Sequence, residues 1–269
     1  MGASMTNKAH RHVLLTYLAV MGLATTTLGG YVACGAQTYR VRVDNDVEFK
    51  SNTSLGESNL FGVHSAKGWT NRLPIHFKTT DSMSTEMVTE LKTAMATWEA
   101  AIGKQLFTYD GTEAKHGPDF AELYSPLADN VNGHYLDPNW SASTKKPNTV
   151  LATTIWENDA HDARYITKAD IRYNTETYIL GNTLTEFSQG DRTIVDLQSL
   201  ALHELGHLLG LSHISTEQDR YSVMNPALFI GEGMITRKLS KGDLERIRSI
   251  YGVGDASKAD ALDYADNSK

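Results

Sequence analysis

The chain of 269 residues has a single cysteine, Cys34, and no excess of positive charge. One thiol cannot form an internal disulfide, so the fold cannot depend on a disulfide framework. Against 32 Asp and Glu residues stand 25 Lys and Arg residues, which gives a formal net charge of −7. Because nucleic acids bind to basic patches, this balance argues against nucleic acid as a partner.

The sequence also has no apolar run that reads as an ordinary transmembrane helix, which needs about 20 residues. Val13–Leu28 is shorter and is interrupted by threonines. It follows a basic start with Lys8 and Arg11 and no acidic residue, and small residues come after it. This order is typical of a secretory signal peptide, which we assign to residues 1–33.

The residues around Cys34 resemble the lipobox of bacterial lipoproteins, in which the cysteine becomes the lipid-bearing first residue. Tyr31 departs from that motif, which usually has an aliphatic residue there. We interpret Cys34 as a lipidation site, which predicts an exported protein at the cell surface or outer membrane. Two alternatives stay open. These are secretion after cleavage behind Ala36 and an uncleaved N-terminal anchor.

The rest of the composition is that of a globular protein, with 41% hydrophobic and 21% charged residues. We expect residues 34–70, which are polar and rich in Ser, Asn and Gly, to form a linker or short pro-segment after a short strand at 38–43. Residues 71–253 are expected to form one folded domain. Residues 254–269 are acidic, small and polar, and predict a disordered tail.

Periodicity within 71–253 predicts a mixture of strands and helices, and hence an α+β fold. Ser84 is a suitable N-cap for an amphipathic helix that ends at Gly103. Ser240 with Asp243 is a capping pattern for a last helix that ends at Gly252. The expected strands are 73–79, 105–109, 150–156 and 169–174.

Residues 110–148 are expected to be loops because they contain Gly117-Pro118, Asp137-Pro138 and Pro147. His116, His134 and Asp137 lie in this stretch and raise the question of a second metal site. No ligand spacing supports such a site, so we favour surface loops for all three.

The strongest chemical signal is His203–His213, which reads HELGHLLGLSH. On a helix, residues four apart share one face, so His203 and His207 can bind one metal ion. Gly210 can end the helix and let the chain turn back to bring in His213 as a third ligand. Three nitrogen ligands leave one zinc position for water, which Glu204 can deprotonate as general base.

With these residues in view, the chain resembles the metzincin metallopeptidases, and within them the matrixin-like branch. Met224 and Pro226 fit the methionine turn of that branch, in which the methionine supports the metal site without binding the metal. Leu239–Gly252 is similar to its closing helix, and Val195–Leu202 leads into the zinc motif in a similar way. The resemblance implies a twisted mixed sheet, an active-site helix, a second long helix, a C-terminal helix and one catalytic Zn²⁺. It also implies that strand 150–156 lies at the edge of the cleft, where an extended peptide can bind by strand addition.

Several positions depart from the matrixin pattern. No cysteine stands where a pro-segment would cap the zinc, so a cysteine switch is not expected. Thr153 and Arg172 stand where histidines would bind a structural zinc, which we therefore do not expect in that form. Gly242 replaces the first member of an acidic pair and leaves only Asp243. Leu228 replaces a tyrosine in the wall of the specificity pocket.

The predicted function is a zinc-dependent endopeptidase that acts on extracytoplasmic proteins or peptides. Zinc held by three imidazoles lowers the pKa of bound water to about 7, and Glu204 transfers its proton to the leaving amine. The expected protein is a monomer that meets a membrane only through a lipid anchor, and calcium binding is left open. Two alternatives are a non-catalytic zinc-containing surface protein and an amidase that acts on cell-wall peptides.

Overall fold

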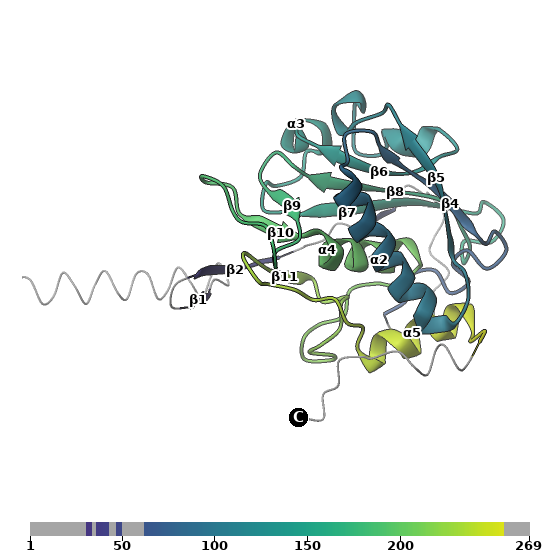
Figure 1. The fold of residues 1–269 in the computed structure, drawn as a ribbon. Coiled ribbons are helices and arrows are strands. Elements are labelled where there is room, and N and C mark those ends of the chain that lie inside the picture. The colour runs from purple at the N-terminus through teal and green to yellow at the C-terminus, as the bar shows by residue number, and fades with distance from the viewer. Residues whose placement is uncertain (1–30, 34–35, 43–46, 50–61, 256–269) are drawn as a thin grey trace, which may run out of the picture.

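The computed structural model describes residues 31–33, 36–42, 47–49 and 62–255 (Figure 1). Most of the predicted signal peptide, the candidate lipidation site Cys34 and the tail from residue 256 onward lie outside the described residues. Among the residues that the structure describes, no helix has the length and apolar character to cross a membrane.

A six-stranded mixed sheet forms one layer of the molecule, with the strand order β3-β7-β8-β6-β4-β5. The pair of β7 and β8 is antiparallel, whereas the other neighbouring strands are parallel. The predicted α+β class is confirmed. The bounds are β3 Val47–Phe49, β4 Ile75–Thr80, β5 Phe107–Glu113, β6 Asn132–Asp137, β7 Ala152–Asn158 and β8 Ile166–Asn174.

In the part of the chain that the structure describes, three helices of eleven residues or more contribute to the core, and capping patterns predict the starts of the first and the last. They are α2 Thr85–Ile102, α4 Leu197–Leu208 and α5 Lys241–Tyr251. Ser84 accepts a hydrogen bond from the Met87 amide, and Ser240 and Asp243 form a complete capping box. Figure 1 shows α4 and α2 beside each other on one side of the sheet, and every residue of α4 is buried.

The packed domain begins earlier than the predicted boundary at residue 71. Val63 and Trp69 belong to the hydrophobic core, with 7% and 2% of their surfaces exposed. Val63 forms a β-bridge with Leu211, and the Trp69 indole donates a hydrogen bond to the Leu208 carbonyl over 2.8 Å. Residues 63–69 are therefore part of the domain rather than of a linker, because they cover the end of α4.

The interpretation of 110–148 as a loop-rich stretch misses the end of β5, which runs to Glu113, and β6, which lies inside the sheet between β4 and β8. Its sequence NGHYLD lacks the β-branched residues that mark buried strands, so its pattern gives no strand signal. His134 is buried in β6, and burial lowers its pKa to about 3, so its ring stays neutral. His116 instead bonds with Asp81 at the surface. The same stretch contains three short helices, η1 Gly117–Asp119, η2 Ser125–Ala128 and α3 Trp140–Thr144.

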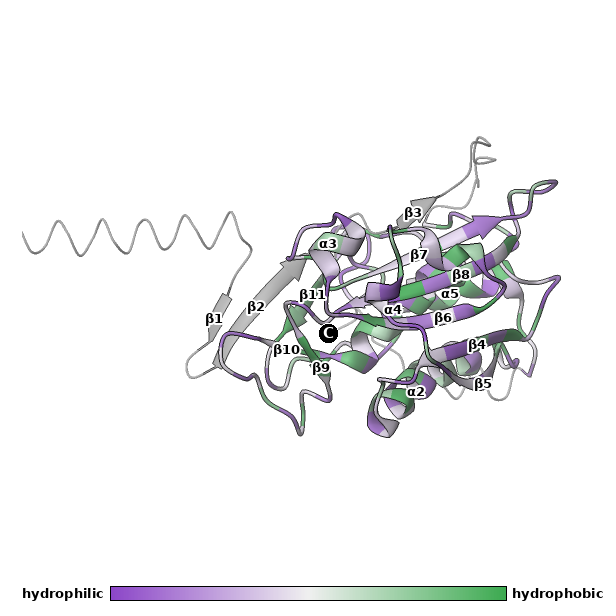
Figure 2. Cartoon of the chain, turned by 90° about the horizontal axis from the view of Figure 1, so that it is seen from above, coloured by the Kyte–Doolittle hydropathy of each residue, from purple (hydrophilic) through white to green (hydrophobic). Residues whose placement is uncertain are grey.

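Short strands complete the fold, and β9, β10 and β11 lie near α4 (Figure 2). Two of them pair in parallel, β9 Ile179–Gly181 and β10 Ile194–Asp196. A separate antiparallel sheet has the order β1-β2-β11, with β1 Tyr31–Ala33, β2 Ala36–Arg42 and β11 Ala227–Ile230. The predicted strand 38–43 corresponds to β2. Because β3 pairs with the outer side of β7, β7 is not the edge strand that the resemblance implies.

Arg172, on β8, carries a fully buried guanidinium group that binds several loop atoms. Its Nη2 donates to the Asp137 carboxylate, to Ser143 Oγ over 2.8 Å and to the Gly117 carbonyl over 3.2 Å. Its Nη1 donates to the carbonyl of Glu122 over 3.0 Å. One fixed cation thus ties β6, β8, η1 and α3 together, at a position where matrixins are expected to hold a metal ligand.

This cluster predicts a large loss of stability for Arg172→Met. The substitution leaves the Asp137 carboxylate buried without its cation, which costs about 3–5 kcal/mol of unfolding free energy. Arg164→Met is the matched control, because Arg164 pairs with Asp162 at the surface and is 54% exposed, where such pairs contribute at most about 1 kcal/mol. Urea unfolding measures both. Equal losses for the two variants would contradict the role of Arg172.

Candidate metal centre

Helix α4 places His203 and His207 one turn apart on the same face, as their spacing predicts. Both side chains are buried, and their Nε2 atoms lie 3.1 Å apart. Asp196 caps the start of the helix by accepting a hydrogen bond from the Ser199 amide. This bond fixes the residue at which α4 begins. The start of the helix in turn determines the face on which the two imidazole rings lie.

A reversal of the chain after α4 brings in the third histidine. Gly210 has a φ of +109°, a backbone conformation that residues with a side chain rarely adopt. A Cβ at this position would also lie 2.8 Å from the Ser65 carbonyl oxygen. After this turn, His213 Nε2 lies 3.0 Å from His207 Nε2 and 3.2 Å from His203 Nε2. In the part of the chain that the structure describes, this is the only group of three or more potential ligand side chains close enough to share an ion.

Hydrogen bonds at the opposite ring nitrogens orient two of the imidazoles. His203 Nδ1 donates to the Val223 carbonyl over 2.7 Å, and His207 Nδ1 donates to the Leu211 carbonyl over 2.8 Å. Burial lowers the pKa of His203 to about 4 and that of His207 well below its ordinary value. At neutral pH both rings are therefore neutral, with the proton on Nδ1 and the Nε2 lone pair directed into the cluster.

This arrangement fits a zinc ion. Tetrahedral zinc with bonds of about 2.0–2.1 Å to nitrogen requires ligand atoms about 3.3 Å apart. The three Nε2–Nε2 distances of 3.0–3.2 Å are close to that value. Three converging lone pairs repel one another unless a cation lies between them, so the donor set itself favours a metal.

The carboxylate of Glu204 is fully buried next to the histidines. Thr154, on β7, donates its hydroxyl to Glu204 Oε2 over 2.6 Å and lies 3.1 Å from the Glu204 carbonyl oxygen. Glu204 follows His203 directly on α4. The contact with Thr154 carries no signal in the sequence, because β7 and α4 are far apart along the chain.

Met224 is fully buried. A Cβ on Gly206 would come within 2.2 Å of the Met224 sulfur, so the methionine packs against the helix backbone between His203 and His207. Pro226 follows in the same turn and is only partly buried. Met224 thus contacts α4 at Gly206, which lies between two of the three histidines.

Asp243 holds this turn in position, a role that the sequence pattern does not reveal beyond its part in the capping box. Its carboxylate accepts hydrogen bonds from the Val223 amide over 2.9 Å and from Ser222 Oγ over 2.5 Å. The carbonyl of the same Val223 orients His203. Asp243, the third residue of α5, is thus connected to the His203 imidazole through the backbone of Val223.

The carbonyl groups at the end of α4 are satisfied by side chains from distant segments. His64 Nε2 donates to the His207 carbonyl over 2.9 Å, and the Tyr251 hydroxyl donates to the Leu209 carbonyl over 2.8 Å. Together with the bond from Trp69 to Leu208, they supply partners that the helix itself cannot provide. His64 and Trp69 lie in the stretch expected to be a linker or short pro-segment, and no pattern in that stretch indicates contacts with the end of a distant helix.

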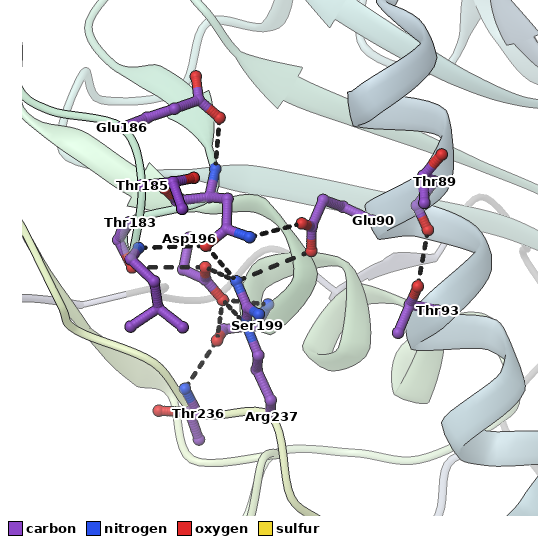
Figure 3. A network of polar contacts seen from close by, with 12 residues as sticks. Thr89, Glu90, Thr93, Thr183, Thr185, Glu186, Asp196, Ser199, Thr236 and Arg237 are labelled. Carbon is purple, nitrogen blue, oxygen red and sulfur yellow. Dashed lines mark hydrogen bonds and ion pairs between the residues drawn. The ribbon is translucent and has the colours of Figure 1, made fainter.

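A buried ion pair fixes the other end of α4 (Figure 3). Arg237 donates to both oxygens of Asp196, over 2.9 Å from Nε and 2.5 Å from Nη2. The Arg237 Nη2 also lies 3.7 Å from Oε2 of Glu90, on α2. The segment after β11 is thereby joined to the helix that carries the histidines, and Leu228 in β11 is buried beside the core.

Comparison with known proteins supports this geometry. The matrixin family model matches residues 65–252. The chain is 47% identical over 60 residues to metalloendoproteinase 5-MMP of Arabidopsis thaliana and 45% identical over 59 residues to metalloendoproteinase 2-MMP of the same plant. Each alignment covers 22% of this chain, and the chain spans only 15% and 14% of the lengths of these relatives. Because the family model covers most of the chain, including the whole three-histidine site, the protein belongs to the matrixin family.

Proposed function

We propose that the protein is a zinc-dependent endopeptidase that hydrolyses peptide bonds of extracytoplasmic proteins. The observation that carries this proposal is the convergence of three imidazole nitrogens on the helix and turn that also carry the buried carboxylate of Glu204. His203, His207 and His213 would hold the zinc, with Met224 supporting them from below. Membership of the matrixin family supports the same activity.

In this proposal the zinc ion, Glu204 and two backbone carbonyl groups have separate roles in hydrolysis. When bound, zinc would supply Lewis-acid chemistry by acidifying a water molecule and withdrawing charge from the carbonyl oxygen of the scissile bond. Glu204 accepts the proton of the attacking water and returns it to the amine that leaves. Val223 and Leu211 keep His203 and His207 in the tautomer that leaves Nε2 able to bind the metal.

The role of Glu204 predicts that Glu204→Ala retains zinc but loses hydrolysis. The value of kcat/KM for a casein-derived peptide should fall by about 10²–10⁴-fold, since general-base catalysis contributes on that order. Zinc content is measured on the same samples. Glu245→Ala, at an exposed position on α5, is the matched control and should keep wild-type activity. If Glu204→Ala cleaved the peptide as fast as wild type, another group would be the base.

We also propose that residues 34–70 include a pro-segment that occupies the substrate cleft. β2 pairs antiparallel with β11, and β3 pairs parallel with β7. β7 carries Thr154, which contacts Glu204, and β11 begins just after the Met224 turn. An extended substrate would need the same strand edges, so paired β2 and β3 would exclude it.

Cutting the chain between β3 and the domain should therefore raise activity. A recognition site for a sequence-specific protease is placed between residues 50 and 61, and hydrolysis of a fluorogenic peptide is followed before and after cleavage. We expect an increase of about 10²-fold, because the tether that gives the segment a high effective concentration is lost. A synthetic peptide of residues 36–49 should inhibit the cut enzyme. An unchanged rate after complete cleavage would exclude the pro-segment.

We further propose that the chain is exported and lipid-anchored through Cys34. The support is the N-terminal sequence, in which a basic start and a short apolar run precede a lipobox-like cysteine. Acyl chains on this residue would hold the enzyme at a membrane surface.

Fractionation of cells that express the full chain tests the anchor. Cys34→Ala should move the protein from the membrane pellet to the soluble extracytoplasmic fraction, because the acceptor of the lipid is removed. Ser51→Ala should remain in the pellet. Equal membrane association of both variants would show that Cys34 is not the point of attachment.

A further inference from the structure

Thr154 places a hydroxyl group against the carboxylate of the proposed base. Its Oγ1 lies 2.6 Å from Glu204 Oε2 and 3.1 Å from the Glu204 carbonyl oxygen. Both residues are completely buried. A hydroxyl has one hydrogen, and the shorter distance assigns it to the carboxylate, where a charge-assisted hydrogen bond forms.

The surroundings of Thr154 give no other reason for a polar side chain. Side chains alternate along a strand, so Ala152, Thr154 and Trp156 share one face of β7. Ala152 and Trp156 belong to the main hydrophobic core with α4, whereas Ile155 belongs to a separate cluster with Leu127. Valine has the same branched shape and suits a strand equally well. A buried hydroxyl here costs free energy unless it is bonded, and the bonds go to Glu204.

The strand holds this hydroxyl in a fixed position. The Thr154 backbone pairs with Ile171 on β8 and with Val47 on β3, so it lies inside the sheet rather than in a loop. A β-branched side chain has few rotamers, which limits the positions of Oγ1. Glu204, by contrast, has a long side chain whose carboxylate can rotate unless it is held.

We propose that Thr154 is a positioning residue for Glu204, an inference that rests on the function proposed above. Its hydroxyl holds Oε2, so that Oε1 is the oxygen that accepts the proton of the attacking water. Holding the base before the substrate arrives removes the need to order it during the reaction. The sequence of the metal motif alone gives no sign of this contact, because Thr154 precedes Glu204 by 50 residues.

Kinetics of two substitutions test the positioning role. Thr154→Val keeps the shape and removes the hydroxyl, and its kcat should fall about 10- to 100-fold, the worth of a hydrogen bond to a charged group. KM and zinc content should stay at wild-type values. Thr154→Ser keeps the hydroxyl and should recover most of kcat. In the Glu204→Gln background, Thr154→Val should have no further effect, because its partner charge is gone. A Thr154→Val enzyme with wild-type kcat would overturn the proposal.

Infrared spectroscopy of the zinc-loaded full chain detects the hydrogen bond between Thr154 and Glu204 independently of peptide hydrolysis. The carboxylate band of Glu204 is identified by its loss in Glu204→Gln. It should shift in Thr154→Val and return to its wild-type position in Thr154→Ser. An unchanged band in Thr154→Val would overturn the positioning role. If the bands behave as expected but the wild-type chain cleaves no peptide, the contact stands and the proposed peptidase function fails.

Discussion

Three imidazole nitrogens converge to within 3.0–3.2 Å of one another in the interior of this protein, and much of the fold serves to keep them there. The lone pairs of nitrogen atoms at such distances repel one another, so the surrounding structure must hold the rings in place. Helix α4 supplies two of them and is buried along its whole length. Its final carbonyl groups accept hydrogen bonds from His64, Trp69 and Tyr251, which come from opposite ends of the domain. The chain can therefore turn at Gly210 while the last carbonyl groups of α4 keep their hydrogen-bond partners.

Buried charged side chains also hold the structure in place, at three further positions. Asp196 with Arg237 fixes the start of α4, and Asp243 fixes the turn that contains Met224. Arg172 with Asp137 ties the loops beyond the sheet to β8. Each of these ions is paired and hydrogen-bonded, as buried charges must be. Arg172 is the clearest departure from the matrixin pattern, since an arginine now makes the connections between strand and loops at that position.

Much of this structure could be predicted from the sequence, for reasons that are local. The spacing of His203, His207 and His213 encodes the metal cluster, and the caps at Ser84 and Ser240 encode two helix starts. β6 was missed because a buried strand with Asn, Gly and Asp lacks the usual β-branched pattern. The boundary near residue 71 was placed too late because the burial of Val63 and Trp69 depends on contacts with α4. Thr154 and Asp243 act on the site through tertiary contacts, which no short sequence window contains.

The central claim is that the three histidines form a zinc site. Crystals of the full chain, purified in the presence of zinc, would be measured on both sides of the zinc absorption edge. The account predicts one anomalous peak per chain, about 2.0–2.1 Å from the Nε2 atoms of His203, His207 and His213. A chain with no peak at this position, or with its zinc bound elsewhere, would contradict it.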